Sequence, residues 1–185
     1  SHNMKHRVLP YAMASLVGLA SALFSGNALP AQEDAVADAV VKSVVARRES
    51  TWQMAQKIWL AAEPGYQETT SSALLADAAE AAGLKVTRGV AEMPTAFVAE
   101  FGSGKPVIAI LGEFDALPGL SQQAQPEPLP RDDANSYGHG CGHHLFGTAS
   151  LSAAIAVAEQ IKAGTIQGTI RYFGCPAEEG GSAKV

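Results

Sequence analysis

Apolar residues recur at helical spacing along two segments of the amino-terminal half of the chain. From Asp34 to about Ala62 they stand three, four or seven positions apart, which predicts one long helix with a single buried face. The apolar positions of that face are Val41, Val44, Val45, Trp52, Ala55 and Trp59, and both tryptophans are expected in the core. A second helix is predicted from a Thr69/Thr70 cap to Gly83. Its inward positions are expected to be Leu74, Leu75, Ala78 and Ala82.

Five further segments complete the predicted framework. Strands are expected at 84–90 and 95–101, where polar and apolar residues mix or alternate, and at 169–173. The continuous apolar run VIAIL at 107–111 predicts a strand that is buried on both faces. A helix with one apolar side is expected over 145–163. Because helices alternate with apolar strands, the chain is predicted to be an α/β layered domain.

Composition and charge narrow the class of protein. The net charge is −5 and no long run of like charge occurs, which argues against a nucleic-acid binder and favours one globular domain that handles small molecules. The segment 118–133 is rich in Pro and Gln and is expected to be loop.

The amino-terminal residues have the organisation of an export signal. Residues 1–3 resemble a cloning remnant, and 4–31 has a basic start, an apolar centre and small residues before cleavage positions after Ala28 or Ala31. An uncleaved membrane anchor is the alternative, but the apolar centre is short for a span and contains Pro and Gly. The protein is therefore expected to be periplasmic or secreted, with 32–185 as its mature part and no membrane attachment after cleavage.

Side chains suited to binding ligands gather in three segments. GEFDALPG at 112–119 follows one apolar strand, GCPAEEGG at 174–181 follows another, and GHGCGHH at 138–144 precedes a helix. Since ligands of open α/β sheets bind beyond the carboxyl ends of the strands, these segments are predicted to form one site.

The residue types in these segments favour a divalent metal. Cys141 and His143 are two positions apart in a glycine-containing turn, so both can reach one point, and a thiolate with an imidazole suits zinc and related ions. The adjacent Glu178 and Glu179 can divide their roles, one binding the metal while the other takes a proton from a metal-bound water.

The cysteines allow two other interpretations. A position at the start of a helix is expected to lower the pKa of the Cys141 thiol, and His139, His143 or His144 could serve as base in a cysteine-nucleophile hydrolase. That mechanism gives the two glutamates no role. In an exported protein Cys141 could also form a disulfide with Cys175, but its histidine neighbours favour metal binding.

The three motifs together resemble a known family. GEFDALPGLSQ, GHGCGHHLFGTAS and PAEEGG, in this order, closely resemble the amidohydrolase/aminoacylase branch of the co-catalytic metallopeptidases. This branch includes hippurate hydrolases, auxin-conjugate hydrolases and the B subunit of p-aminobenzoyl-glutamate hydrolase, whose motifs are nearest. The resemblance runs from about Trp52 to Gly181. It implies a zinc-exopeptidase-like catalytic domain, with a central mixed sheet and flanking helices, that hydrolyses an amide bond in N-acyl or aminobenzoyl amino acids or in dipeptides.

The resemblance also implies a role for each site residue. Cys141, His143 and Glu179 would be ligands in a site for two divalent ions, zinc or manganese, with cobalt or nickel as alternatives. Glu178 would be the general base that activates the water between the ions. Asp115 matches an aspartate of the family's strand-end motif and is expected to orient a ligand or a loop.

Three residues stand outside this ligand set. His139 matches the family pattern without being a main ligand. His144 departs from the Asp or Asn that is usual there, and the change is expected either to alter the hydrogen bonds around the ligands or to add an optional ligand. Cys175 stands where Thr is common and is expected to be a small buried residue.

Members of this branch continue well beyond the length of this chain. After the glutamates they insert a lid and dimerisation domain and then complete the catalytic domain, which contributes two further histidine ligands. The chain is therefore expected to be the amino-terminal part of a longer parent, with little activity alone, and the parent is expected to be a homodimer through the lid. A non-catalytic exported module that binds metal or a partner is the alternative.

Overall fold

The computed structural model describes residues 29–181. The chain divides into two compact units, Ser1–Asp34 and Ala35–Val185, and only the first turns of α1 (Leu29–Ala46) are described in the first unit. The expected cloning remnant (1–3) and nearly all of the expected signal peptide (4–31) lie outside the described residues. Within residues 29–181, no helix combines the length and the apolar character needed to cross a membrane.

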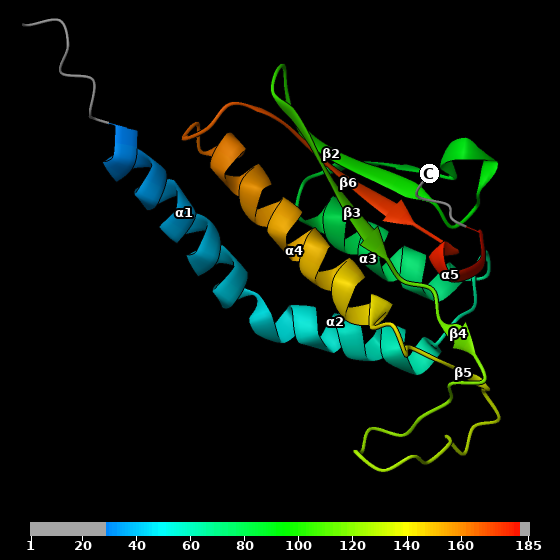
Figure 1. The fold of residues 1–185 in the computed structure, drawn as a ribbon. Coiled ribbons are helices and arrows are strands. Elements are labelled where there is room, and N and C mark those ends of the chain that lie inside the picture. Colours follow the sequence, from blue (N-terminus) through cyan, green and yellow to red (C-terminus); the bar gives the residue numbers. More distant parts are fainter. Residues whose placement is uncertain (1–28, 182–185) are drawn as a thin grey trace, which may run out of the picture. The chain divides into compact units, whose positions relative to one another are not determined.

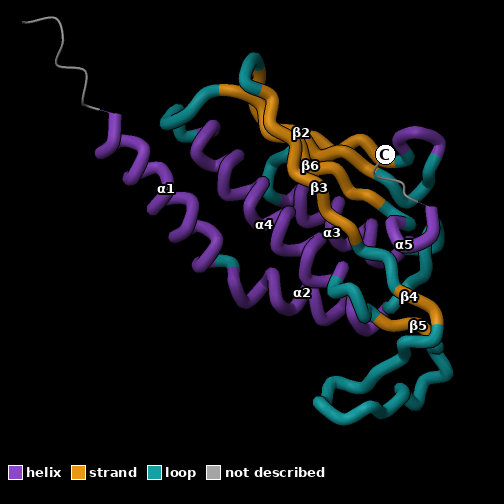
Figure 2. Tube along the Cα trace, in the orientation of Figure 1, coloured by secondary structure: helices purple, strands orange, loops and turns teal. Residues whose placement is uncertain are grey.

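A four-stranded mixed sheet forms the centre of the second unit (Figures 1 and 2). Its strands, in spatial order, are β1 (Lys85–Arg88), β2 (Phe97–Ser103), β6 (Gly168–Cys175) and β3 (Val107–Glu113). β2 pairs antiparallel with β1 and with β6, whereas β3 runs parallel to β6. Because Glu113 pairs with Cys175 at the shared carboxyl end, the GEFDALPG and GCPAEEGG segments leave the sheet side by side.

Two helices cover one face of the sheet, and a third packs on these two. α3 (Thr69–Ala81) and α4 (His143–Lys162) pack on the same face, and α2 (Arg48–Ala61) packs against both of them (Figure 1). The largest buried apolar side chains of the core between these layers are Ile58, Leu75, Phe97, Phe114, Leu151, Ile170 and Tyr172. The short elements are η1 (Val90–Glu92), β4 (Leu117–Pro118), β5 (Tyr137–Gly138) and α5 (Glu178–Gly181). The predicted α/β fold, a mixed sheet with flanking helices, is confirmed.

The single long helix predicted over 34–62 is two helices. At Arg47 the backbone has φ −101° and ψ 13°, which interrupts the hydrogen-bond ladder between α1 and α2. The face that α2 buries is narrow and consists of Ala55 and Ile58. Trp52 is 50% exposed, so its predicted place in the core is wrong, and Trp59 is half-buried beneath the guanidinium of Arg131.

The ends of α3 agree with the prediction, but its cap does not. Gly83 follows the helix with φ +91°, a conformation that glycine adopts without steric cost. Neither threonine caps the first turn. Instead the carboxylate of Glu63 accepts hydrogen bonds from the N–H groups of Thr70 and Ser71, both at 2.8 Å. The first turn thus obtains its acceptor from the chain that precedes the helix.

β3 is only half covered. It is the last strand of the four-stranded sheet, and Val107, Ile108 and Leu111 are exposed to solvent. The expectation that this run is buried on both faces is therefore wrong for the described residues. Exposed residues lie on both faces of the strand, because α4 packs on only part of it and no further strand of the described sheet lies beside it.

Candidate metal centre

His143 is the centre of the site. It is the first residue of α4, and the chain enters the helix through Gly142, whose φ of +84° favours glycine. Its ring is buried, and Nδ1 donates a hydrogen bond to Oδ1 of Asp115 at 2.8 Å. On the other side of the ring, Nε2 lies 2.9 Å from Glu113 Oε2, 3.8 Å from Glu178 Oε2 and 3.9 Å from Glu179 Oε1. One edge of the imidazole is therefore fixed while the other faces three carboxylates.

Asp115 connects two of the predicted ligands. Its Oδ1 accepts from His143, and its Oδ2 accepts from the backbone N–H of Glu179 at 2.9 Å. Burial of Asp115 would raise the pKa of its carboxyl, but the two hydrogen bonds and the neighbouring imidazole outweigh burial and lower it. Asp115 is thus ionised at neutral pH and holds both His143 and the turn that carries Glu179, as an orienting residue would.

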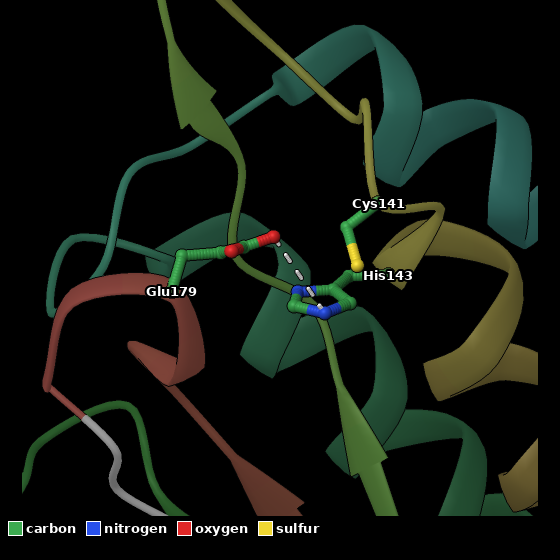
Figure 3. Close-up of side chains that lie close together, drawn as sticks. All are labelled: Cys141, His143 and Glu179. Atoms are coloured by element: carbon green, nitrogen blue, oxygen red, sulfur yellow. Dashed lines mark ion pairs between the residues drawn. The ribbon is translucent and has the colours of Figure 1, made fainter.

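Cys141 lies with His143 and Glu179 at one point of the surface (Figure 3). One ligand atom from each residue lies within 4.8 Å of the other two, so the structure brings the predicted ligand set together. The expectation of a lowered thiol pKa is contradicted. Desolvation by neighbouring protein atoms and the negative charges of Glu179 and Glu178 raise the pKa of Cys141, although the residue is exposed.

A raised thiol pKa disfavours the cysteine-nucleophile mechanism, since the thiolate is the reactive form. Cys141 and Cys175 do not form a disulfide in the described part of the chain, so the weaker alternative is not realised there. Cys175 is 5% exposed at the end of β6, which confirms it as a small buried residue.

The donor set fits a divalent cation. Four carboxylates, those of Glu113, Asp115, Glu178 and Glu179, contact or closely approach one imidazole that can carry a single positive charge. Burial lowers the pKa of His143, but these carboxylates, with Asp115 first, outweigh burial and raise it. Surroundings that stabilise a proton on Nε2 equally stabilise a metal ion there, and thiolate, imidazole and carboxylate are zinc ligands.

Glu113 belongs to the site, although its place in the GEFDALPG motif predicted no role for it. Its side chain is 6% exposed, and together with His143 and Glu178 it forms a second group whose ligand atoms lie within 4.8 Å of one another. The signal was present in the sequence, because residues two apart on an extended strand end point to the same side, as Glu113 and Asp115 do.

A second feature without a predicted role is the segment EPGYQE, residues 63–68, which follows the helix that was predicted to end at about Ala62. These residues join the GEFDALPG segment, since Ala116 N–H donates to the carbonyl of Glu63 at 2.9 Å. Its last residue, Glu68, is completely buried and accepts a hydrogen bond from Ala177 N–H at 2.7 Å. The segment therefore touches two of the three motifs that build the site.

His139 and His144 lie together outside both groups of ligand atoms. Their ring centroids are 4.9 Å apart, and Nε2 of His139 hydrogen-bonds the carbonyl of Ile58 at 3.1 Å. Burial and the neighbouring histidines lower the pKa of His144 to about 4, and burial lowers that of His139. Both rings are therefore neutral near pH 7, and neither belongs to a group of ligand atoms among the described residues.

Comparisons with known proteins show that the chain is similar to hydrolases and peptidases. The chain is 49% identical over 142 residues to the B subunit of p-aminobenzoyl-glutamate hydrolase from Escherichia coli, a match that covers 77% of this chain and 30% of that protein. It is 30% identical over 131 residues to thermostable carboxypeptidase 2 of Saccharolobus solfataricus, with 70% and 32% covered. No family model matches the chain.

Among solved structures, the chain is similar to a dinuclear metal-binding peptidase of the M20 family from Bacillus subtilis. The TM-score is 0.59 at 29% sequence identity, and the match covers 72% of this chain and 36% of that one. The chain thus spans about a third of the length of the relatives that it matches.

Proposed function

Because the chain belongs to the metal-dependent amidohydrolases and peptidases that these relatives represent, we propose that it supplies the metal-binding part of an amide-hydrolysing active site. The observation that carries the proposal is the surroundings of His143 Nε2, with the Cys141 thiol and the carboxylates of Glu178 and Glu179 gathered on its open side. The Escherichia coli relative is named for the hydrolysis of p-aminobenzoyl-glutamate, which supports an aminobenzoyl amino acid as substrate. In our proposal the substrate class also includes other N-acyl amino acids and dipeptides.

Cys141, His143 and Glu179 would hold divalent ions, zinc or manganese, in a site for two metals like that of the Bacillus subtilis relative. When bound, such ions polarise the amide carbonyl and make a water acidic enough to lose a proton near neutral pH. Asp115 keeps Nδ1 of His143 protonated, so that the lone pair of a neutral ring is on Nε2, towards the ligand atoms.

Glu178 would move the proton in this reaction. Its Oε2 lies 3.8 Å from Nε2 of His143 and belongs to the second group of possible ligand atoms, so the carboxylate is within reach of a water bound at the site. The carboxylate would accept a proton from the attacking water at Oε2 and return it to the nitrogen of the departing amine. The backbone N–H of the neighbouring Glu179 donates a hydrogen bond to Asp115. The two adjacent glutamates can therefore have different roles, Glu179 as a metal ligand and Glu178 as the base.

The complete enzyme would need more than these residues. In our proposal this chain corresponds to the amino-terminal part of the catalytic domain, and the remaining ligands and most substrate contacts come from the part of the relatives that the match does not cover. A homodimer formed through that part belongs to the same proposal.

Export is a separate proposal that rests on residues 4–31 alone. The basic start, apolar centre and small residues before Ala28 and Ala31 are those of a cleaved signal. Expression of the chain in a bacterium followed by sequencing of the mature amino terminus tests it. A product that keeps its first residues and remains in the cytoplasm would contradict export.

Metal titration of neighbouring histidine variants tests the proposed function. Zn²⁺ affinity, measured by calorimetry after chelator treatment, should be lost in His143→Ala, since removal of a direct ligand destroys the site, and retained in the matched control His144→Ala. Equal affinities of the two variants would refute the assignment.

Hydrolysis is tested in the parent enzyme with p-aminobenzoyl-glutamate as substrate. Glu178→Gln should bind Zn²⁺ as the wild type does and lose about 10²–10⁴-fold in kcat, the usual contribution of a general base. The exposed Glu92→Gln serves as control. A Glu178→Gln enzyme that turns over at the wild-type rate would contradict this role.

A further inference from the structure

The turn that presents the two adjacent glutamates is an unusual piece of backbone. It runs from the end of β6 at Cys175 to α5, and Ala177 within it has φ +53°, in the region that favours glycine. A non-glycine residue in this conformation persists only where its surroundings determine it. The contacts of Ala177 therefore decide where the next two residues point.

Those contacts come from the EPGYQE segment. A Cβ atom placed on Gly65 would lie 2.8 Å from Cβ of Ala177, so the two backbones are in close contact. A Cβ on Gly181 would lie 2.3 Å from the Tyr66 hydroxyl, which shows that the end of α5 is equally close to the same segment. EPGYQE thus lies against both ends of the glutamate turn.

Glu68 provides the polar contact between the two segments. Its Oε1 accepts from Ala177 N–H at 2.7 Å, and its Oε2 accepts from the Thr95 hydroxyl at 3.0 Å. The side chain is 0% exposed, and a carboxylate is buried to this extent only where its hydrogen bonds are made. Glu68 lies outside both groups of ligand atoms at the metal centre, so the metal site itself does not account for it.

We propose that Glu68 is a positioning residue for the candidate metal centre. By holding Ala177 N–H, its carboxylate fixes the turn from which Glu178 and Glu179 face His143. Asp115 accepts a hydrogen bond from the same turn two residues later, from the N–H of Glu179. The turn is thus held at two successive points by buried carboxylates from different segments. The proposal rests on the proposed function for the use of the site, while the backbone restraint exists without a metal.

Three variants distinguish the effect of side-chain length at Glu68 from the effect of its charge and from a general loss of stability. Glu68→Asp keeps the charge but is one methylene shorter and cannot keep both contacts. Glu68→Gln keeps the length, with its amide oxygen available to Ala177 and its NH₂ group to the Thr95 hydroxyl. Thr95→Val, the matched control, removes only the second contact and leaves the one to Ala177.

Two measurements on the full chain decide between the outcomes. Amide hydrogen exchange in a peptide covering 175–181 should rise by about tenfold in Glu68→Asp, because Ala177 N–H loses its acceptor. Zn²⁺ affinity should fall by about 10–100-fold, the usual loss when an outer contact to a ligand is removed. Glu68→Gln and Thr95→Val should resemble the wild type in both measurements.

Each contrary result has a distinct meaning. Unchanged exchange over 175–181 in Glu68→Asp, or a rise spread evenly over the molecule, overturns the proposal. Faster exchange with wild-type Zn²⁺ affinity also overturns it, since the contact would then be structural only. A wild-type chain that binds no Zn²⁺ refutes the proposed function instead, and the exchange measurement still decides whether Glu68 holds the turn.

Discussion

Asp115 offers the sharpest test of how the candidate site is assembled, because one buried side chain holds two predicted ligands. Its Oδ1 accepts from the ring of His143 at 2.8 Å and its Oδ2 from the N–H of Glu179 at 2.9 Å. Asp115→Asn keeps the size of the side chain but leaves a single acceptor oxygen. Either the histidine or the glutamate backbone must then face an NH₂ group, and one hydrogen bond is lost.

The loss can be estimated from the character of these bonds. A hydrogen bond to a charged group contributes about 1.5–3 kcal/mol, and 1.4 kcal/mol corresponds to tenfold in a binding constant. If the whole loss falls on the geometry of the ligands, Zn²⁺ affinity in Asp115→Asn decreases by about 10–100-fold. The raised pKa of His143 depends first of all on Asp115 among its carboxylate neighbours, so the variant also weakens the charge that favours a cation.

Competition with a chelator of known affinity measures the change, and far-ultraviolet circular dichroism verifies that the variant is folded. Asp77→Asn is the matched control, because Asp77 is an exposed aspartate that pairs with Arg88 at 2.9 Å, away from the site. It should bind Zn²⁺ as the wild type does. A folded Asp115→Asn chain with wild-type affinity would refute the reasoning, since the two contacts would then do nothing for the ligands.

Two further predictions concern the framework around the site. Glu63→Gln should lower the free energy of unfolding by about 1–2 kcal/mol at pH 7, since one acceptor of the first turn of α3 is lost. Burial raises the pKa of Glu63, but hydrogen bonds from that turn outweigh it and lower the pKa below 4.5. The difference should therefore be full well above pH 4.5 and should decline as the pH falls from there through the lowered pKa of the folded state. Urea unfolding at pH 7 and pH 3 checks this, and a difference independent of pH would contradict it. Gly147→Ala should cost about 1–3 kcal/mol by forcing α4 away from β3, because its Cβ would lie 2.4 Å from the carbonyl oxygen of Glu113. Gly180→Ala, whose Cβ meets nothing within 4 Å, is the control, and equal melting temperatures for the two variants would disprove the steric argument.

Much of the fold and the site could be predicted because the signals are local. Alternation and apolar runs located the strands, and Gly83 marked the end of a helix that stops where predicted. The meeting of the three motifs at one edge of the sheet followed from a rule about strand ends, and β3 and β6 are parallel neighbours as that rule expects. The choice of Cys141, His143 and Glu179 as one ligand set came from the resemblance to the family, and their ligand atoms lie together.

The errors arise where distant residues decide. Trp52 fits the apolar spacing of its helix, yet only the side that meets α3 and α4 is covered, and sequence spacing cannot show how wide that side is. The cap of α3 comes from Glu63, six residues before the helix begins, rather than from the threonines at its start. Glu68 meets Ala177 across 109 positions, a contact that no local pattern encodes.

The acids around the site fall into two sets that should respond differently to substitution. Asp115 and Glu68 accept backbone N–H groups from the turn at 177–179, so the turn can form before any metal binds. These hydrogen bonds outweigh burial and lower the pKa of Asp115, whereas burial outweighs them at Glu68 and raises its pKa. Glu178 and Glu179 instead direct their carboxylates towards His143, where they repel one another until a cation arrives. Variants of the first set that break these contacts, such as Asp115→Asn and Glu68→Asp, should therefore lose stability and metal affinity together. Variants of the second set should lose metal affinity or turnover while the metal-free chain keeps, or gains, stability, since a repulsive charge has been removed.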